Sequence, residues 1–534
     1  MQHSSSAIRI VRVPERQEAG NTKPNVLVRL SQNAIFNLFR TGSGWIVVVF
    51  LPPLFVRVLD KPTYGVWLLL LQLAAYITVV DSGIQVAIAR FVARAIELED
   101  HKYLARLLSS SGVIMVAASL LTLLSSVLVA WQLPHVFSKI PDTIAPAARQ
   151  ALLIIGTSIA LTLPFSVVAG FFVGLQRYEI PALATTAGKY VGALGIAWAA
   201  YHHQGLAIMA VWVALGNIVQ CLVYIWFWRR ADKHNLLHHS YAERAVIHEF
   251  LFFCSVMFVS QFSSILVTGM DLPIVAAFDF QSSGYYGIAA TVSNLLIVPH
   301  SAIVSTLIPV AAGYSTANDP QRLGQVLLKT TRFATALLCL ILLPLMLTMP
   351  LLLRLWVGSD YATHVLAYGQ ILIIAQFIRL TMLPYAMIGY AAGQQQRMLV
   401  SAVAEGSVNL LSSLVLVRLI GAGGVALGTL AGAIVGVWLH FCISLPRTDC
   451  IQISRKRLLW DSIGKPAVLT LPFFACAVLV TKVHVPLIEI LLAFMVDVAL
   501  FCLFWNLIFD SEERRQLMGV LRHFARIPTK LQMG

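Results

Sequence analysis

The segment from Pro62 to Asp100 constrains the fold more than any other part of the sequence. After a turn signal it stays almost entirely apolar for longer than a helix of a soluble protein needs, and it ends with two arginines before an acidic patch. About 20 apolar residues are enough to cross a bilayer as a helix, and basic residues mark cytoplasmic ends. The segment therefore predicts a membrane-spanning helix with one costly charge, Asp81, inside it.

Similar apolar runs recur along the whole chain. Apolar residues make up 58% of the 534 residues and charged residues only 12%, with a mean hydropathy of +0.80. Because soluble domains carry about 25% charged residues, we expect an all-α, polytopic membrane protein, and the runs predict about fourteen spans. The basic residues behind the net charge of +14 lie in short clusters between the runs, so nucleic acid is not an expected partner.

The distribution of Lys and Arg predicts the orientation of the chain. When both termini are placed in the cytoplasm, most basic residues fall on the inner side, as the positive-inside rule requires. Those on or near the outer side are then Arg57, Lys61, Lys139, Arg149, Arg354, Arg418 and Lys482. Residues 1–31 contain no short apolar core followed by a small-residue cleavage site, so we expect the first span itself to direct insertion.

The chain reads as two copies of one plan. The runs that open with Tyr64-Gly65 and with Tyr286-Gly287 are each followed by an Asp-x-x-x-Leu sequence, at Asp100 and Asp319. The expected organisation is a cytoplasmic N-terminal segment (1–31), an N-lobe with spans one to six (32–230), a linker (231–248), a C-lobe with spans seven to twelve (249–446), a cytoplasmic loop (447–465), an extra helix pair (466–509) and a basic tail (510–534).

Basic residues deep in the apolar runs are candidate substrate-binding groups. A charge at the bilayer centre costs about 2.5–3.5 kcal/mol on insertion scales, and Lys189 and Arg379 lie roughly 12 and 20 Å from the nearest membrane face at 1.5 Å per residue. We expect both to point into the bundle. With Arg40 and Arg57 near the two ends of the first span, they suggest a cationic lining for an anionic substrate.

The alternative is that these bases form internal salt bridges, Lys189 with Asp81 or Arg379 with Glu405. Both interpretations hold together if a paired base exchanges its carboxylate for a substrate phosphate. The candidate ion-coupling or charge-balancing residues are Asp81, Asp271, Glu405 and His300. Asp271 and Glu405 either bind a coupling proton or sodium ion or are neutralised, hydrogen-bonded structural acids. No other cofactor is expected.

The polar loops contain no recognisable metal or catalytic site. Of His234, His238 and His239, the first two have a spacing that could hold a metal on one face of a helix, but their basic loop offers no third ligand at helical spacing, so we expect no metal. An acidic loop pair for a sugar nucleotide and a Ser, His, Asp constellation on one face are both missing from the sequence. We therefore expect a transporter rather than an enzyme, with its function carried between the helices.

Several short stretches follow one another in a recognisable order over nearly all of the first twelve spans. They are Tyr64-Gly65-Val66-Trp67, Val80-Asp81-Ser82-Gly83-Ile84, Gly174-Leu175-Gln176-Arg177, Leu353-Arg354-Leu355-Trp356-Val357-Gly358 with Tyr361, Ala404-Glu405-Gly406 with Asn409-Leu410, and Gly424-Val425-Ala426-Leu427-Gly428-Thr429. In this order they resemble the polysaccharide flippases of the multidrug/oligosaccharidyl-lipid/polysaccharide exporter superfamily. Asp81, Arg354, Glu405 and Asn409 match motif positions.

This resemblance implies two pseudo-symmetric six-helix bundles around a central cavity and alternating access by rocking of the bundles. It also implies the substrate, a polyprenyl-diphosphate-linked oligosaccharide moved from the cytoplasmic to the outer leaflet of the bacterial inner membrane for cell-surface polysaccharide biosynthesis. Membrane lipids, a polysaccharide polymerase and other assembly proteins are the expected partners. The two spans beyond the twelve-helix core are expected to line a groove for the lipid tail.

Three other functions stay open on the sequence. A peptidoglycan lipid-precursor flippase is the hardest to separate from the expected one. A multidrug or metabolite exporter of the same fold would have twelve spans and an acidic cavity. The two extra spans and the buried bases argue against this function. A membrane polymerase or ligase would need a sizeable outer loop with basic and histidine residues, which the sequence lacks.

Overall fold

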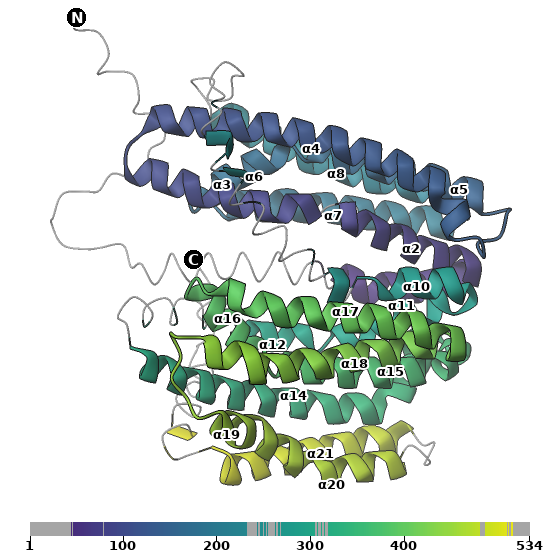
Figure 1. Cartoon of the computed structure of the whole chain (residues 1–534). Coiled ribbons are helices and arrows are strands. Elements are labelled where there is room, and N and C mark those ends of the chain that lie inside the picture. Colours follow the sequence, from purple (N-terminus) through teal and green to yellow (C-terminus); the bar gives the residue numbers. More distant parts are fainter. Residues whose placement is uncertain are drawn as a thin grey trace, which may run out of the picture. The chain divides into compact units, whose positions relative to one another are not determined.

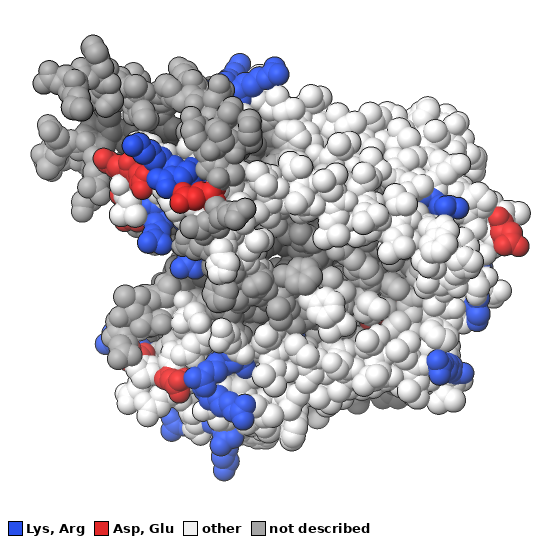
Figure 2. All heavy atoms as spheres, turned by 45° about the horizontal axis from the view of Figure 1, so that its top comes forward, with Lys and Arg blue, Asp and Glu red and all other residues white. Residues whose placement is uncertain are grey.

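The computed structural model describes the chain in several stretches. They are residues 44, 46–77, 79–231, 269–304, 319–480 and 486–509, with 243, 246–248, 250, 251, 254, 262, 265–267, 307, 311, 314, 511, 514 and 515. Within them all regular secondary structure is helical, and eight helices are long and apolar enough to cross a membrane. Figure 2 shows most charged side chains near the ends of the helices, with a largely uncharged surface between them. The predicted all-α, multi-pass membrane protein is confirmed, while the number of spans stays a prediction.

The helices form two compact units (Figure 1). Unit 1 comprises the described residues of Met1–Ile265 and of Leu272–Gly284, and unit 2 those of Leu266–Asp271 and of Tyr285–Gly534. The chain therefore changes unit on either side of the segment from Leu272 to Gly284.

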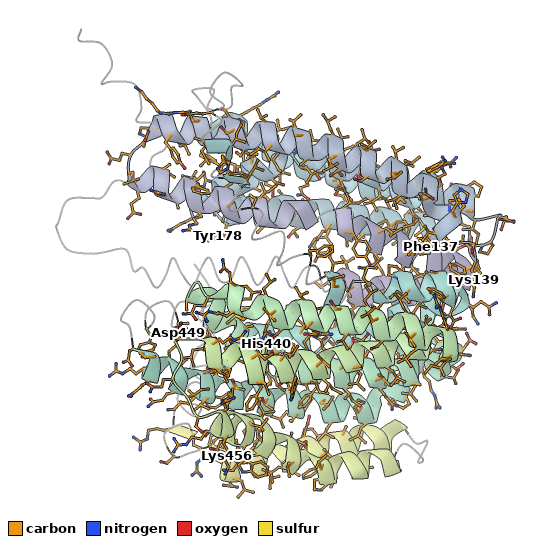
Figure 3. The ribbon with its side chains drawn as sticks, in the orientation of Figure 1. Phe137, Lys139, Tyr178, His440, Asp449 and Lys456 are labelled. Carbon is orange, nitrogen blue, oxygen red and sulfur yellow. The ribbon has the colours of Figure 1, made fainter. Side chains whose placement is uncertain are left out.

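Unit 1 is built from long apolar helices that pack against both adjacent and more distant helices of the sequence. Its helices are Ile46–Val58, α2 Lys61–Ile77, α3 Val79–Glu97, α4 His101–Val136, α5 Ala145–Thr162, α6 Phe165–Gly174, α7 Glu179–Tyr201 and α8 Gly205–Ala231, with most of α10 Asp271–Phe278 and with η2 Phe280–Ser282. α5 packs against α4 and α8, α7 against α8, and α3 against α6. Lys139, which lies near Phe137 beyond the end of α4 (Figure 3), donates to the carbonyl oxygen of Phe278 and so holds the end of α10 in this unit.

Unit 2 repeats this arrangement and extends it. Its helices are most of α11 Ser283–Asn294, then α12 Ile297–Val304, α14 Pro320–Val357, α15 Ser359–Leu380, α16 Leu383–Ala391, α17 Gln395–Ile420, α18 Ala422–Leu439, η3 His440–Ser444, η4 Leu445–Arg447, α19 Arg455–Arg457, η5 Leu458–Gly464, α20 Lys465–Val480 and α21 Pro486–Leu507. α15 packs against α14 and α18, and α17 packs against α18. These pairs match α5 with α4 and α8, and α7 with α8, of unit 1.

The fourth span of each copy is interrupted at a similar place. The fourth span of unit 1 is split into α5 and α6 at Pro164, and its counterpart is split into α15 and α16 just before Pro384. Proline has no N–H for the preceding turn and clashes with the carbonyl group four residues earlier, so a helix breaks or bends there. In unit 2 the second span is also split, between α11 and α12.

Both copies begin their third span with the same cap. The Asp100 Oδ1 atom accepts a hydrogen bond from the backbone N–H of Tyr103 at 2.8 Å, and Asp319 Oδ1 accepts one from Arg322 at 3.0 Å. Each aspartate thus satisfies one of the unpaired N–H groups at the start of a helix, α4 or α14. The leucine four residues after each aspartate is buried. The Asp-x-x-x-Leu sequences are therefore two copies of one helix start.

Both copies also share the turn that ends their fourth span. After α6 the backbone of Gln176 has a φ of +59°, and after α16 that of Gly393 has a φ of +72°. The next residue then donates its N–H to the carbonyl group five residues earlier, over 2.9 Å at Arg177 and 2.8 Å at Gln394. This left-handed turn is a common way to satisfy the last carbonyl groups of a helix, and it supports the predicted pseudo-symmetry.

The last two helices belong to the body of unit 2. Figure 1 shows α20 and α21 along α14, against which both pack. Their apolar contact joins Ala336, Cys339 and Leu343 of α14 to Leu500, Phe504, Ile508 and Phe509 of α21 and the turn after it. The rings of Phe333 and Phe509 stack with their centroids 4.9 Å apart. The extra helix pair is thus attached to α14, the third span of unit 2.

Candidate functional site

The candidate site is a group of buried polar side chains in unit 2, centred on Asp271. The Asp271 Oδ2 atom accepts hydrogen bonds from the hydroxyl groups of Thr429, at 2.8 Å, and Tyr286, at 3.1 Å, while Oδ1 accepts one from Asn409 Nδ2 at 3.0 Å. Helices α18, α11 and α17 supply these three donors. Asp271 is only 7% exposed and begins α10, where the positive end of the helix dipole favours a carboxylate.

The amide group of Asn409 is held in one orientation by its neighbours. Its Nδ2 also donates to the carbonyl oxygen of Val267 at 2.9 Å, and its Oδ1 accepts from the hydroxyl group of Ser413 at 3.0 Å. An amide group presents donors on one side and an acceptor on the other, so this pattern turns the donor side toward Asp271. The cage around the carboxylate therefore consists of hydrogen-bond donors.

A buried salt bridge forms the second part of the site. Arg379 Nε donates to Glu405 Oε1 at 2.6 Å, with the two side chains only 17% and 8% exposed, and Arg379 Nη1 donates to Gln376 Oε1 at 3.0 Å. Arg379 also interacts electrostatically with Asp271. The predicted pair of Arg379 with Glu405 is confirmed. Its remaining nitrogen, Nη2, is buried and has no hydrogen-bond partner.

Local structure explains why these charges meet. Arg379 is in the last turn of α15, where the negative end of the helix dipole favours a base, and the helix stops directly after it. Glu405 and Asn409 are one turn apart on α17, so both face α18. They pack against Gly432 and Gly436, where α18 offers no side chain. Small residues are what allow two membrane helices to approach closely enough to enclose polar groups.

The charges of the site do not balance. Arg379 contributes one positive charge, while Asp271 and Glu405 contribute two negative charges when ionised. An unbalanced charge is costly in a medium of low dielectric constant. The arrangement can therefore accept one further positive charge, as a proton on a carboxylate or as a small cation.

Unit 1 holds glycine where unit 2 holds these polar residues. Relative to the shared left-handed turn, Gly188 on α7 occupies the place that Glu405 occupies on α17, and Gly192 occupies the place of Asn409. Gly188 lies directly against the backbone of Gly216 on α8. Of the two matching helix pairs, only α17 and α18 of unit 2 therefore hold the acidic site, and α7 and α8 of unit 1 do not.

Lys189 lies on the surface of unit 1. Its side chain is exposed, which differs from the predicted burial, because the adjacent Gly188 is the residue that faces α8. A Cβ atom added to Gly44 would lie 3.4 Å from Lys189 Nζ, so this amine is beside the start of the first span. Asp81 lies in α3, but its side chain is outside the described part of the chain, and its pairing with Lys189 stays a prediction.

The other predicted residues are dispersed. Arg57 is exposed near the end of the helix Ile46–Val58, Arg354 is exposed in the last turn of α14, and Arg40 and the histidines 234, 238 and 239 lie outside the described residues. His300 is fully buried in α12, and neither of its ring nitrogens has a hydrogen-bond partner. Its part in charge balance stays a prediction.

Some polar groups of the site were not predicted. Tyr286 and Thr429 belong to sequence motifs noted above, but their hydrogen bonds to Asp271 join residues 15 and 158 positions apart. Outside this site, Asp497 lies midway along α21, and its Oδ1 is buried without a hydrogen-bond partner. A sequence signal for Asp497 does exist, since it is the one acid in the middle of the last apolar run.

Comparison with known proteins identifies the family. The family described as polysaccharide biosynthesis protein matches residues 30–315, which is more than half of the chain. The chain therefore belongs to this family. No curated protein matches the chain.

Solved structures show which fold the family has here. An inward-facing multidrug resistance MATE family transporter of the MOP superfamily matches with a TM-score of 0.67 at 14% identity, covering 79% of this chain and 97% of its own. The lipid II flippase MurJ in an inward closed conformation matches with a TM-score of 0.66 at 15% identity, covering 89% of this chain and 99% of its own. A MOP superfamily transporter from Pyrococcus furiosus matches with a TM-score of 0.56 at 15% identity, covering 79% of this chain and 95% of its own. The chain thus has the fold of MOP-superfamily transporters and flippases.

Proposed function

We propose that the protein flips a polyprenyl-diphosphate-linked oligosaccharide from the cytoplasmic to the outer leaflet of the membrane by alternating access. The observation that carries the proposal is the buried cluster of Arg379, Glu405 and Asp271 inside a helical unit of a polysaccharide biosynthesis protein. A polar cluster at this depth is expensive in a membrane unless it has a functional use. In this chain that use is to bind and release charge during transport.

The substrate requires compensation for its own charge. A lipid diphosphate carries about two negative charges into a region where each one is costly. We propose that Arg379 and Lys189 hold the diphosphate, with Arg40 and Arg57 near the two ends of the first span. Arg379 has a buried nitrogen without a partner, and its carboxylate partner Glu405 can be replaced by a phosphate oxygen, because a guanidinium group binds both with the same geometry.

Asp271 is the proposed coupling residue. When Arg379 turns to the substrate, Glu405 loses its partner, and the site then holds two carboxylates that need a proton or a sodium ion. Binding of this cation in one state of the cycle and its release in the other would give transport a direction, since a ligand shifts an equilibrium only by its difference in affinity between the two states. Asp81 and His300 are further candidates for charge balance.

A peptidoglycan lipid-precursor flippase is the second candidate. The observation that favours it is coverage, since the lipid II flippase aligns over 89% of this chain and the MATE transporter over 79%. Both substrate classes carry a polyprenyl diphosphate, so the same bases would serve either. The multidrug or metabolite exporter of the same fold is the third candidate.

A cellular test separates the first two functions. Cells that lack the protein should lose surface polysaccharide, keep normal growth and accumulate the lipid-linked repeat unit. Growth arrest with lysis and an intact polysaccharide would instead assign the peptidoglycan precursor. Loss of neither product would contradict both flippase functions.

A further inference from the structure

The segment between α18 and α20 is docked firmly on the beginning of α14. The backbone N–H of Gln452 donates to the carbonyl oxygen of Pro320 at 3.0 Å. The hydroxyl group of Ser462 donates to the carbonyl oxygen of Leu328 at 2.9 Å. Leu458 is fully buried among apolar side chains of unit 2. These contacts fix which side chains of the segment face outward.

The outward side combines positive charge with large apolar groups. Arg455, Lys456 and Arg457 of α19 are exposed, and none of them forms an ion pair with any described residue. Immediately after them, Leu459 is 52% and Trp460 53% exposed. Figure 3 labels Lys456 at the place where Figure 1 labels α19, the helix to which it belongs. We call these five residues the basic–aromatic patch.

The acids near the basic–aromatic patch that the structure describes are paired with other bases. Asp461 is paired with Lys465 at 3.1 Å, and Asp449 is paired with Arg397 at 3.1 Å. Among the described residues no acid is therefore paired with the three basic side chains, and their charge can attract an external anionic partner. The patch also lies directly before Lys465, where the apolar helix α20 begins, so it is at the border of the membrane.

We propose that the basic–aromatic patch binds the headgroups of anionic phospholipids in the cytoplasmic leaflet, with Leu459 and Trp460 inserted below them. Clustered Lys and Arg beside a membrane helix are attracted to anionic lipid surfaces, and tryptophan prefers the depth at which headgroups meet the acyl chains. A soluble acidic partner would match the charge of the patch but would leave the two large apolar side chains in water. A bilayer surface suits both features.

Lipid binding at this place would hold the extra helices against the rest of unit 2. The patch is joined to α14 by hydrogen bonds and to α20 by the chain itself. An anionic bilayer that binds the patch therefore stabilises the contact of α20 and α21 with α14. The proposal does not depend on which lipid-linked glycan the protein transports.

The test uses the full-length protein in nanodiscs of zwitterionic phospholipid with or without phosphatidylglycerol. One variant combines Arg455→Gln, Lys456→Gln and Arg457→Gln. The matched control combines Arg94→Gln, Lys102→Gln and Arg229→Gln, which removes the same charge from exposed helix ends of unit 1. Native mass spectrometry measures retained phosphatidylglycerol, and quenching by brominated lipid, compared between wild type and Trp460→Phe, measures the insertion of Trp460.

The patch variant should bind phosphatidylglycerol at least about tenfold more weakly than wild type, and the binding by the control variant should change much less. Brominated lipid should quench more fluorescence in wild type than in Trp460→Phe. Equal melting temperatures in zwitterionic nanodiscs would show that the variants are folded. Equal loss of binding in patch variant and control would overturn the proposal. Displacement of the lipid by inorganic phosphate would assign the patch to free anions instead. Equal quenching with and without Trp460 would contradict the insertion of Trp460.

Discussion

Arg379 and Glu405 are joined by a 2.6 Å hydrogen bond in a place where their side chains are 17% and 8% exposed. Such a pair is stable only while both members stay together, because the removal of one leaves the other charged and desolvated. The pair is also positioned to open, since one nitrogen of Arg379 has no partner and Asp271 lies within its electrostatic influence. Stability and transport therefore make different demands on the same two residues, and variants can separate them.

Single substitutions in this pair should destabilise the protein strongly. Arg379→Ala or Glu405→Ala breaks a buried salt bridge, which typically costs about 3–5 kcal/mol in free energy of unfolding. The double variant Arg379→Met with Glu405→Leu leaves no buried charge at these positions and should be close to wild type in stability. Melting temperatures in detergent measure both effects.

Transport by the double variant distinguishes structure from function. If Arg379 binds the substrate diphosphate, this variant should be folded and abundant but should not restore surface polysaccharide. Normal polysaccharide from the double variant would limit the pair to a structural role. Lys189→Arg should restore more polysaccharide than Lys189→Ala, because only the first keeps the charge. Equal restoration by the two Lys189 variants would remove Lys189 from the substrate site.

Asp271→Asn should uncouple transport while it preserves the fold. The amide keeps the shape of the carboxylate and retains an oxygen that accepts from Thr429 and Tyr286, while its NH2 group faces the donor Asn409 Nδ2; it carries no charge and binds no proton at this site. We expect normal abundance and loss of the dependence of transport on pH or sodium. Reconstituted vesicles with an imposed proton or sodium gradient provide the measurement.

Thr429→Val is the matched control for Asp271. It deletes the 2.8 Å hydrogen bond to Oδ2 and should cost about 1–3 kcal/mol in stability, yet the coupling charge stays in place. Its transport should therefore keep the wild-type response to the gradient. An Asp271→Asn protein with the same response would exclude Asp271 as the coupling residue.

The repeated turn allows a stability test with opposite signs. Gln176 has a φ of +59°, a conformation that costs a residue with a side chain roughly 1–2 kcal/mol, whereas Gly393 at +72° adopts it easily. Gln176→Gly should raise the melting temperature and Gly393→Gln should lower it. The same sign for both variants would show that the two turns are not equivalent.

Sequence patterns predicted the local features of this protein better than its long-range contacts. The Asp-x-x-x-Leu sequences and the apolar runs act within one or two helical turns, and the structure has them as caps and helices. The pair of Arg379 with Glu405 was also predictable, because two opposite charges 26 residues apart on neighbouring spans have few other partners. The number of spans and the lobe boundaries stay predictions.

The cage around Asp271 could not be predicted, because it depends on how α17 and α18 approach each other. Asn409 and Thr429 reach Asp271 across 138 and 158 residues, and their contacts need the glycines of α18 in a register that no local pattern specifies. Lys189 illustrates the same limit. Counting residues from the membrane face gives its depth, but only the contact of Gly188 with Gly216 shows that the lysine turns away from α8.

The most direct test of the central claim is a flipping assay with purified protein in liposomes. A polyprenyl-diphosphate oligosaccharide is placed in the inner leaflet, and its appearance outside is followed with a membrane-impermeant glycosidase or lectin. We predict protein-dependent flipping that is lost with Arg379→Met/Glu405→Leu and that exceeds flipping of a peptidoglycan precursor. A rate no higher than that of empty liposomes, or flipping of the peptidoglycan precursor alone, would contradict the account.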